Sequence, residues 1–213
     1  MTLYITNSDN IIIKSDIMRL EAKIISLLAK DIKKEFTINE IAKNLGEHYS
    51  FVHRIVNRLS KDKIITKNII GKSWACSLNL ELEKTIILIK LSEIESKEKF
   101  YEKNKTLKLI LNDFTDSITQ ISRNITVILF GSYAKNTATE KSDIDILVIS
   151  QGEIELDKIT KEIYAKYGKE INPILMDSNE FKNQKDKPII KDVIKDHYIL
   201  YGVEKFVNMV FKE

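Results

Sequence analysis

Apolar residues recur every three or four positions through the first part of the chain, a pattern typical of helices that bury one face. A first helix is predicted from about residue 15. Thr37-Ile-Asn-Glu40 is a capping box, because the Thr hydroxyl and the Glu carboxylate can each accept a hydrogen bond from a backbone amide. It predicts a short second helix over 38–44. Ser50 is placed to cap a third helix.

Stretches of β-prone residues follow these helices. Two of them, 64–69 and 73–78, are separated by a three-residue turn that contains Gly, which predicts a hairpin. Trp74 and Cys76 in this hairpin are expected to pack against the three helices. Three helices and a hairpin together describe a winged helix-turn-helix domain, which we place at residues 1–79.

The remainder of the chain has a helical part and an alternating part. Residues 80–124 contain no Gly or Pro and predict two helices, 80–102 and 105–122. We interpret 80–104 as a helical linker between domains. Beyond it, strands are predicted at 125–130, 143–150 and 171–176, and helices at 132–137, 155–167, 189–195 and 198–211. The fold class is therefore α+β, with a C-terminal domain over 105–213 in which a small mixed sheet is flanked by helices.

Composition narrows the possible functions. The chain has 213 residues and a net charge of +3, but residues 1–79 carry 13 basic and 8 acidic side chains, whereas residues 80–213 carry 21 and 23. The positive excess in the first third favours a polyanionic partner there. A single cysteine excludes an intrachain disulfide. The apolar stretches are too short to cross a bilayer and the N-terminus lacks a signal-peptide pattern, so we expect a cytoplasmic protein with no membrane partner.

One stretch of the C-terminal domain carries recognisable chemistry. An apolar strand ends at Gly131-Ser132, and a second strand begins with Asp143-Ile-Asp145. Strand side chains alternate between faces, so both carboxylates share one face, and two adjacent carboxylates suit Mg²⁺ that also binds substrate phosphates. Gly131 permits close backbone approach, and Ser132 places a hydroxyl beside a helix start. These features predict a nucleoside triphosphate bound with its metal.

Each half of this pattern is common by itself. An isolated Asp-x-Asp is most often a solvated strand edge, and an isolated Gly-Ser is most often a turn. The two halves lie eleven residues apart, however, and apolar strand residues flank both of them. This combination favours a nucleotide site over an ordinary surface turn.

Residues 130–135 and 142–145 closely resemble the signature of the minimal nucleotidyltransferases of the DNA polymerase beta-like superfamily, and the resemblance extends over about 107–201. It implies that the Gly-Ser turn binds the triphosphate and that the Asp pair holds Mg²⁺ or Mn²⁺, with ATP as the expected nucleotide. The roles that it implies are phosphate binding for Gly131 and Ser132, and metal binding and catalysis for Asp143 and Asp145. Lys135 stands where the family often has a basic residue; phosphate binding and a solvated surface position are both open to it.

The sequence departs from this family at the third carboxylate, which active members carry on a later strand. The corresponding position is Asn172, whose side chain cannot take a proton as a general base. Glu170 lies on the same strand face and is a candidate catalytic substitute, although an exposed Glu at a strand end is an equally ordinary feature. Nucleotide binding is therefore better supported by the sequence than catalytic turnover.

The predicted third helix has a basic face without an acidic residue until Asp62, and its N-terminal part would enter the major groove of DNA. The residues expected to contact DNA are Tyr49, Ser50, His53, Arg54, Asn57, Arg58, Lys61 and, on the wing, Lys72. The domain also resembles winged helices that are fused to nucleotidyltransferases in prokaryotic proteins. Winged helices can bind proteins instead, but the basic face favours DNA.

Two functions from different classes follow. In the first, the protein is a DNA-binding enzyme that transfers a nucleotidyl group to a protein or RNA acceptor. In the second, it is a winged-helix transcriptional regulator or antitoxin-like protein, whose nucleotidyltransferase domain binds a nucleotide or a partner with little turnover. Because winged-helix proteins commonly pair to bind two half-sites, a homodimer is expected in either case.

Overall fold

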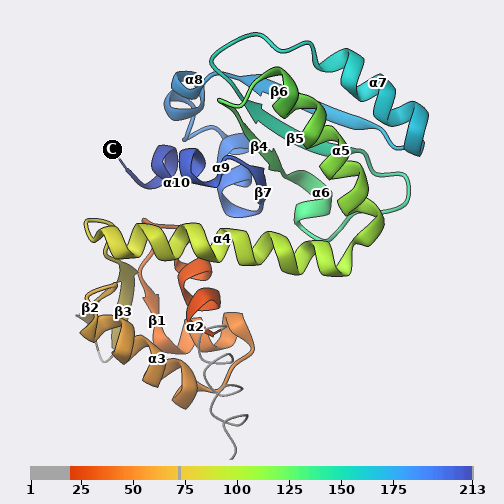
Figure 1. Ribbon diagram of the computed structural model, residues 1–213. Helices are drawn as coiled ribbons and strands as arrows, with labels where there is room; N and C mark the ends of the chain where they lie inside the picture. Colours follow the sequence, from red (N-terminus) through yellow and green to blue (C-terminus); the bar gives the residue numbers. More distant parts are fainter. Residues whose placement is uncertain (1–19, 72, 213) are drawn as a thin grey trace, which may run out of the picture. The chain divides into compact units, whose positions relative to one another are not determined.

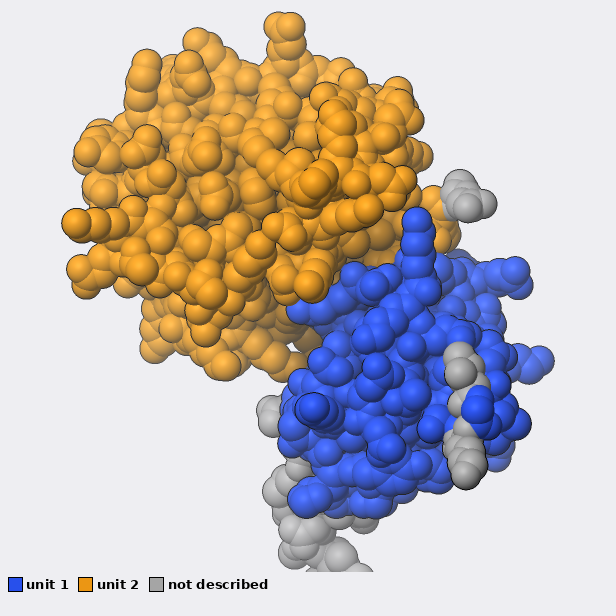
Figure 2. Space-filling model, turned by 180° about the vertical axis from the view of Figure 1, so that it is seen from behind, with its two compact units in different colours: residues 1–92 blue, residues 93–213 orange. Residues whose placement is uncertain are grey.

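The computed structural model describes residues 20–71 and 73–212 (Figure 1). The chain forms two compact units, residues 1–92 and 93–213, which Figure 2 colours separately. The division falls inside the long helix α4 (Glu83–Lys103), and the domain boundaries expected from the sequence remain a proposal. Among the described residues, none of the helices combines the length and apolar content that a bilayer crossing requires.

The helices of the first unit follow the predicted pattern. Residues 20–29 are helical, and α2 (Ile38–Leu45) and α3 (Tyr49–Lys61) come next. The capping box is confirmed, because Glu40 N donates to the Thr37 hydroxyl and Thr37 N donates to the Glu40 carboxylate.

The predicted Ser50 cap of α3 is wrong. The helix begins at Tyr49, two residues before the start that a Ser50 cap implies, because the amides of Phe51 and Val52 already bond to the carbonyl of His48. His48 is therefore the N-cap, and its side chain makes no capping hydrogen bond. The predicted start of the first helix, near residue 15, lies outside the described residues.

A three-stranded antiparallel sheet completes the first unit. The strands β1 (Phe36–Thr37), β2 (Ile65–Ile70) and β3 (Ser73–Leu78) lie in the order β1-β3-β2. One face of the sheet packs on the helices, and Cys76 is fully buried there. Three helices and a β-hairpin in this order form a winged helix. Trp74 does not pack into the core as expected: its side chain is 44% exposed near the tip of the hairpin.

The second unit is built on a four-stranded mixed sheet. The strands are β4 (Thr126–Leu129), β5 (Ile144–Ile149), β6 (Ile171–Met176) and β7 (Tyr198–Tyr201), in the order β6-β5-β4-β7. Strands β5 and β6 are parallel, whereas β4 is antiparallel to both of its neighbours. The central strands β4 and β5 are almost wholly buried, which explains why their sequences are continuously apolar.

Helices cover both faces of this sheet (Figure 1). Alternate strand residues such as Ile144 and Ile146 pack with α5 (Lys105–Ile121) and α7 (Leu156–Tyr167). The intervening residues, such as Leu147, pack with the helices of the opposite face. Those helices are α8 (Ser178–Asn183), α9 (Pro188–Lys195) and α10 (Val203–Phe211). The α+β architecture predicted from the sequence is confirmed.

The end of the chain corrects one prediction. A single helix was expected over 198–211, but residues 198–201 form the edge strand β7, and α10 begins only after Gly202. Gly202 has a φ of +80°, and a Cβ atom there would lie 2.5 Å from the carbonyl oxygen of Ile125. The left-handed glycine therefore separates the strand from the helix and lets the chain turn closely against the start of β4.

Candidate active site

The two predicted carboxylates lie at the start of β5. Asp145 is the second residue of the strand, and Asp143 directly precedes it. Ile144 and Ile146 are fully buried in the core beneath α5 and α7, so the side chain of Asp145 projects from the opposite face, as the alternation predicts. Asp145 is half-buried and Asp143 is exposed, which leaves this pair of acids accessible to a charged ligand.

Gly131 lies directly against the Asp145 carboxylate. Its φ is +71°, and a Cβ atom at this position would lie 2.9 Å from Cγ of Asp145 and closer still to Oδ2. The backbone fixes this approach, because the amide of Phe130 donates to the carbonyl oxygen of Asp145 over 3.0 Å. Only glycine satisfies both the left-handed conformation and the space. The Gly-Ser turn and the acid are thus parts of one site.

The pKa of Asp145 is raised above its ordinary value. Burial is the main cause, since it disfavours the charged carboxylate, and the negative charge of Asp143 acts in the same direction. A hydrogen bond from Asn172 opposes these effects in part. The negative charge of ionised Asp145 is therefore only partly balanced by the protein. A cation bound between the two acids would balance it.

Asn172 occupies the strand position next to Asp145. The two residues are register partners in the parallel pair of β5 and β6, and Nδ2 of Asn172 donates to Oδ1 of Asp145 over 3.5 Å. The position at which the sequence predicts the third carboxylate thus lies beside Asp145. The amide oxygen of Asn172 is a possible metal ligand, but it has no proton-accepting role at neutral pH.

Glu170 directly precedes β6, and its catalytic role stays a prediction. Its carbonyl oxygen accepts from the amide of Ile144, but its side chain is exposed. Across residues 20–71 and 73–212, no three His, Cys, Asp or Glu side chains converge in a group that could hold a metal ion. Asp143 and Asp145 therefore stand as a two-carboxylate set, which fits Mg²⁺ that also uses phosphate oxygens as ligands.

The Gly-Ser turn begins a very short helix, α6 (Gly131–Ala134). Ser132 is half-buried, and its carbonyl oxygen accepts from the amide of Thr137 over 2.9 Å, which fixes the loop that follows. Ser142 in turn accepts from the amide of Thr139 over 2.9 Å. These bonds define the loop that connects the turn to the two acids.

Lys135 is paired with an acid that sequence analysis missed. Its Nζ lies 2.8 Å from Oδ2 of Asp192, on α9, and this contact raises the pKa of Lys135 and lowers the pKa of Asp192. Both side chains are largely exposed, so the pair is weak in water. Asp192 is 57 residues further along the chain and belongs to no local motif, so only the tertiary structure could reveal it.

The predicted DNA-contacting residues lie mainly on one exposed face of α3. Tyr49, Ser50, Arg54 and Lys61 are exposed, and His53 and Asn57 are half-buried. The guanidinium of Arg54 lies 5.4 Å from the centroid of the Phe51 ring. Arg58 instead forms an ion pair with Glu21 of the first helix. Lys72 lies outside the described residues.

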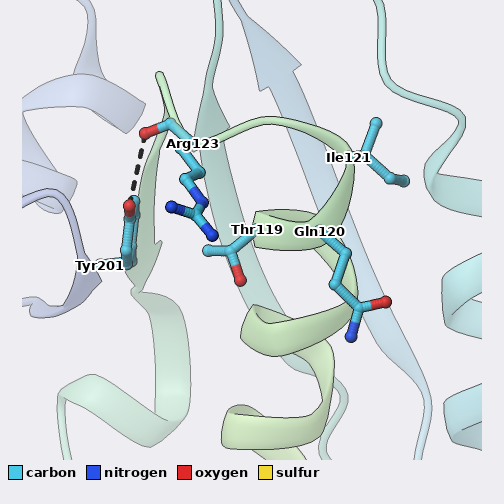
Figure 3. Close-up of a pocket in the computed structure, with 5 residues that line it drawn as sticks. All are labelled: Thr119, Gln120, Ile121, Arg123 and Tyr201. Carbon is cyan, nitrogen blue, oxygen red and sulfur yellow. Dashed lines mark hydrogen bonds between the residues drawn. The ribbon is translucent and has the colours of Figure 1, made fainter.

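A pocket opens at the other end of the same sheet (Figure 3). Its lining comes from the end of α5, from the loop that precedes β4, and from β7, and consists of Thr119, Gln120, Ile121, Arg123 and Tyr201. The Tyr201 hydroxyl donates to the carbonyl oxygen of Arg123 over 3.4 Å. Because β4 runs from this pocket toward Gly131, the pocket lies at the opposite end of the strand from the acids and is not part of their site.

Comparisons with known proteins agree with this geometry. Residues 111–201 match the family model described as a nucleotidyltransferase domain. The chain is 33% identical over 112 residues to "Putative protein adenylyltransferase MJ1305" of Methanocaldococcus jannaschii, which covers 48% of this chain and 76% of the relative. It is 35% identical over 78 residues to "Putative protein adenylyltransferase MJ0604" of the same organism, which covers 35% of this chain and 76% of the relative.

A solved structure of MepR, a transcription regulator of a Staphylococcus aureus multidrug efflux pump, is 18% identical and covers 53% of this chain and 98% of its own. Its TM-score is only 0.32, so we draw nothing from this likeness. The winged helix is assigned from the observed strands and helices alone. The family match over 111–201, in contrast, includes both the Gly-Ser turn and the Asp pair. Together with the 33% identical relative, it places this chain in the nucleotidyltransferase family.

Proposed function

We propose that the C-terminal domain binds a nucleoside triphosphate together with Mg²⁺ and transfers its nucleotidyl group to an acceptor. The observation that carries this proposal is the packing of Gly131 against the Asp145 carboxylate, beside Asp143. This contact brings the Gly-Ser turn, as the phosphate-binding element, and a pair of metal ligands to one point. A bound Mg²⁺ would offset part of the negative charge of the acids and of the triphosphate.

The reaction is the substitution of pyrophosphate at the α-phosphorus. An acceptor oxygen forms a bond to that phosphorus while the bond to the bridging oxygen of pyrophosphate breaks. The acceptor hydroxyl releases its proton to water, and pyrophosphate leaves. Gly131 and Ser132 would contact the phosphates, and Asp143 and Asp145 would hold the metal. Lys135 must break its ion pair with Asp192 to reach a phosphate. Because that pair is exposed to solvent, breaking it costs little free energy.

The nucleotide and the acceptor come from the relatives. Both relatives carry the description "Putative protein adenylyltransferase", which supports ATP as the nucleotide and a protein hydroxyl as the acceptor. An RNA end remains the second acceptor class for the same chemistry. A cytoplasmic location is part of this proposal.

An alternative is nucleotide binding with little turnover, and Asn172 favours it. The residue opposite Asp145 is an amide that donates a hydrogen bond to the acid, so it cannot take the acceptor's proton. In this alternative the protein senses nucleotide or joins a partner, and the winged helix acts as a regulator. The rate of nucleotidyl transfer is the measurement that distinguishes the two functions.

The proposal is tested with labelled triphosphates and Mg²⁺ or Mn²⁺, by scoring the label on the protein itself, on added proteins and on RNA. Wild-type protein is expected to transfer label, and Asp145→Asn to reduce transfer by about 10³-fold, because loss of one metal ligand removes several kcal/mol of charge stabilisation. Label that appears equally with the double variant Asp143→Asn/Asp145→Asn would exclude this site.

The single variant Asp145→Asn should also show whether lost transfer comes from the missing metal ligand or from an unstable fold. Because the pKa of Asp145 is raised in the folded protein, the folded state binds this proton more tightly than the unfolded chain does. Ionised Asp145 therefore destabilises the fold at neutral pH, and this cost disappears as the pH falls through the raised pKa. Without metal, Asp145→Asn is expected to have a Tm at pH 7 equal to or above that of wild type. A lower Tm would mean that lost transfer reflects damage to the fold.

We also propose that the winged helix docks on duplex DNA through the exposed face of α3, as a homodimer with two recognition helices. Tyr49, Ser50 and Arg54 near the helix start would face base edges, with His53 beside them. Lys61 lies near the helix end, where phosphates of the backbone would pass. The support for this is an exposed, basic helix face on a winged-helix fold.

Two arginines of α3 test the DNA proposal against each other. Arg54 lies against an aromatic ring, whereas Arg58 is already paired with Glu21. Arg54→Ala is therefore expected to weaken DNA binding more than Arg58→Ala. It should also make the slope of log K against log salt less steep by about one unit, the effect of one lost phosphate contact. The measurement is a fluorescence-polarisation titration at several salt concentrations. Equal binding by wild type and both variants would rule out α3 as the DNA-contacting helix.

A further inference from the structure

A continuous row of side chains connects the start of α3 to the wing. We call it the wing row, and its members are Tyr49, His53, Asn57, Lys67 and Trp74. The rings of Tyr49 and His53 are stacked with centroids 5.6 Å apart, and Nδ2 of Asn57 lies 3.2 Å from Nε2 of His53. Lys67 Nζ donates to Oδ1 of Asn57 over 2.7 Å and lies 4.9 Å from the centroid of the Trp74 ring. The first three residues are four positions apart on one helix face.

The contacts of Asn57 fix the orientation of its amide. The Lys67 ammonium can only donate, so Oδ1 of Asn57 must face it and Nδ2 must face His53. Nδ2 of Asn57 then lies within 3.3 Å of both ring nitrogens of His53. Bidentate recognition of adenine by Asn needs both of these amide groups. In this structure both are already engaged within the protein.

Trp74 is placed where a contact outside the protein is possible. It lies opposite Ile69 in the hairpin, and the two side chains are 44% and 68% exposed. Trp74 shares a strand face with Cys76, which is fully buried, so this face of the sheet continues from the core onto the open wing. The Lys67 ammonium holds the indole through a cation–π contact on the side of α3.

We propose that Asn57 is a positioning residue, which anchors Lys67 and through it holds Trp74 at a fixed place beside α3, and that Trp74 contacts the sugar–phosphate backbone of bound duplex DNA. This rests on the DNA binding proposed above. In this proposal the wing contacts DNA through an aromatic side chain, and Asn57 orients neighbouring side chains instead of hydrogen-bonding a base. The contact fits DNA backbone because an indole offers an apolar face to deoxyribose and an N–H donor to phosphate.

The free protein tests the positioning role first. Trp74 is the only tryptophan of the chain, so its fluorescence anisotropy reports on this one side chain. Asn57→Ala and Lys67→Met should lower the Trp74 anisotropy, whereas Asn57→Asp should retain it, because a carboxylate still accepts from Lys67. Asn68→Ala is the matched control: Asn68 is the next residue of β2, projects from the other face, and bonds to Glu35. Unchanged anisotropy in Asn57→Ala would overturn the positioning role.

Duplex DNA then tests the contact. Addition of a bound duplex should quench wild-type Trp74 emission, and Asn57→Ala and Trp74→Ala should each weaken binding by about fivefold, the usual effect of one lost hydrogen-bonded contact. Asn57→Ala should keep the base preference of wild type on a panel of single-base changes. A changed preference at one base pair would make Asn57 a base reader and overturn the proposal. If wild type binds no duplex, both the proposed DNA binding and the proposed Trp74 contact are excluded. The anisotropy measurement on the free protein still tests the positioning role of Asn57.

Discussion

Replacing Asn172 by Asp is expected to increase metal-dependent nucleotidyl transfer to a hydroxyl acceptor by about 10²-fold, the lower end of what general acid–base catalysis supplies. Asn172 is the register partner of Asp145, so the new carboxylate would lie beside the two acids that are already present. It could accept the proton that the acceptor hydroxyl releases and could add a third ligand to the metal. The measurement is the rate of label transfer with Mg²⁺ at saturating nucleotide.

Asn172→Asp should also lower the stability of the metal-free protein. The Asp145 carboxylate would lose the Asn172 hydrogen bond that now lowers its pKa, and would gain a negative neighbour that raises it further. The metal-free Asn172→Asp variant is therefore expected to have a lower Tm than wild type at pH 7, with the loss shrinking as the pH falls or as Mg²⁺ is added. A Tm that does not respond to Mg²⁺ would contradict metal binding by these acids.

Glu170→Gln is the control that keeps this result interpretable. If Glu170 were the base of the wild-type protein, its removal would abolish transfer, and Asn172→Asp would add little. We expect the opposite, because the Glu170 side chain is exposed and does not join the two acids in a group. Comparable transfer by wild type and Asn172→Asp, with loss in Glu170→Gln, would assign the base to Glu170.

The parts of this site that could be predicted from sequence are those fixed by local backbone rules. Alternation along a strand places Ile144 and Ile146 in the core and Asp145 on the opposite face, and this needs no knowledge of the rest of the fold. Likewise, a capping box specifies its own hydrogen bonds within four residues. The paired strand-and-turn pattern around Gly131 was recognisable for the same reason.

The features that sequence analysis missed depend on contacts between distant segments. The edge strand over 198–201 is four residues long, and pairing with β4, not its own pattern, makes it a strand. Asp192 meets Lys135 only because α9 packs near α6 in the folded domain. Trp74 was expected to pack against the three helices, but it lies near the tip of the hairpin and its side chain is 44% exposed. None of these three features can be inferred from the secondary-structure propensity of the local sequence.

Gly131→Ala is expected to abolish nucleotide binding, and Gly168→Ala is its matched control. Both glycines have positive φ, +71° and +63°, so an Ala at either position pays the same backbone strain of about 1–2 kcal/mol. A Cβ atom at Gly168 meets nothing within 4 Å, whereas at Gly131 it would overlap the Asp145 carboxylate. The difference between the two variants therefore isolates the steric displacement of Asp145 from the strain.

Thermal unfolding and isothermal titration with ATP and Mg²⁺ measure the two effects separately. Gly168→Ala should lose stability and keep wild-type nucleotide affinity. Gly131→Ala should lose at least as much stability and should also lose binding, because the new methyl group would displace the Asp145 carboxylate from its place against the turn. Both variants with unchanged affinity would mean that Asp145 does not bind the metal–nucleotide complex. Equal losses of affinity in both would trace the effect to a general weakening of the domain, since Gly168 lies at the end of α7 and touches neither acid.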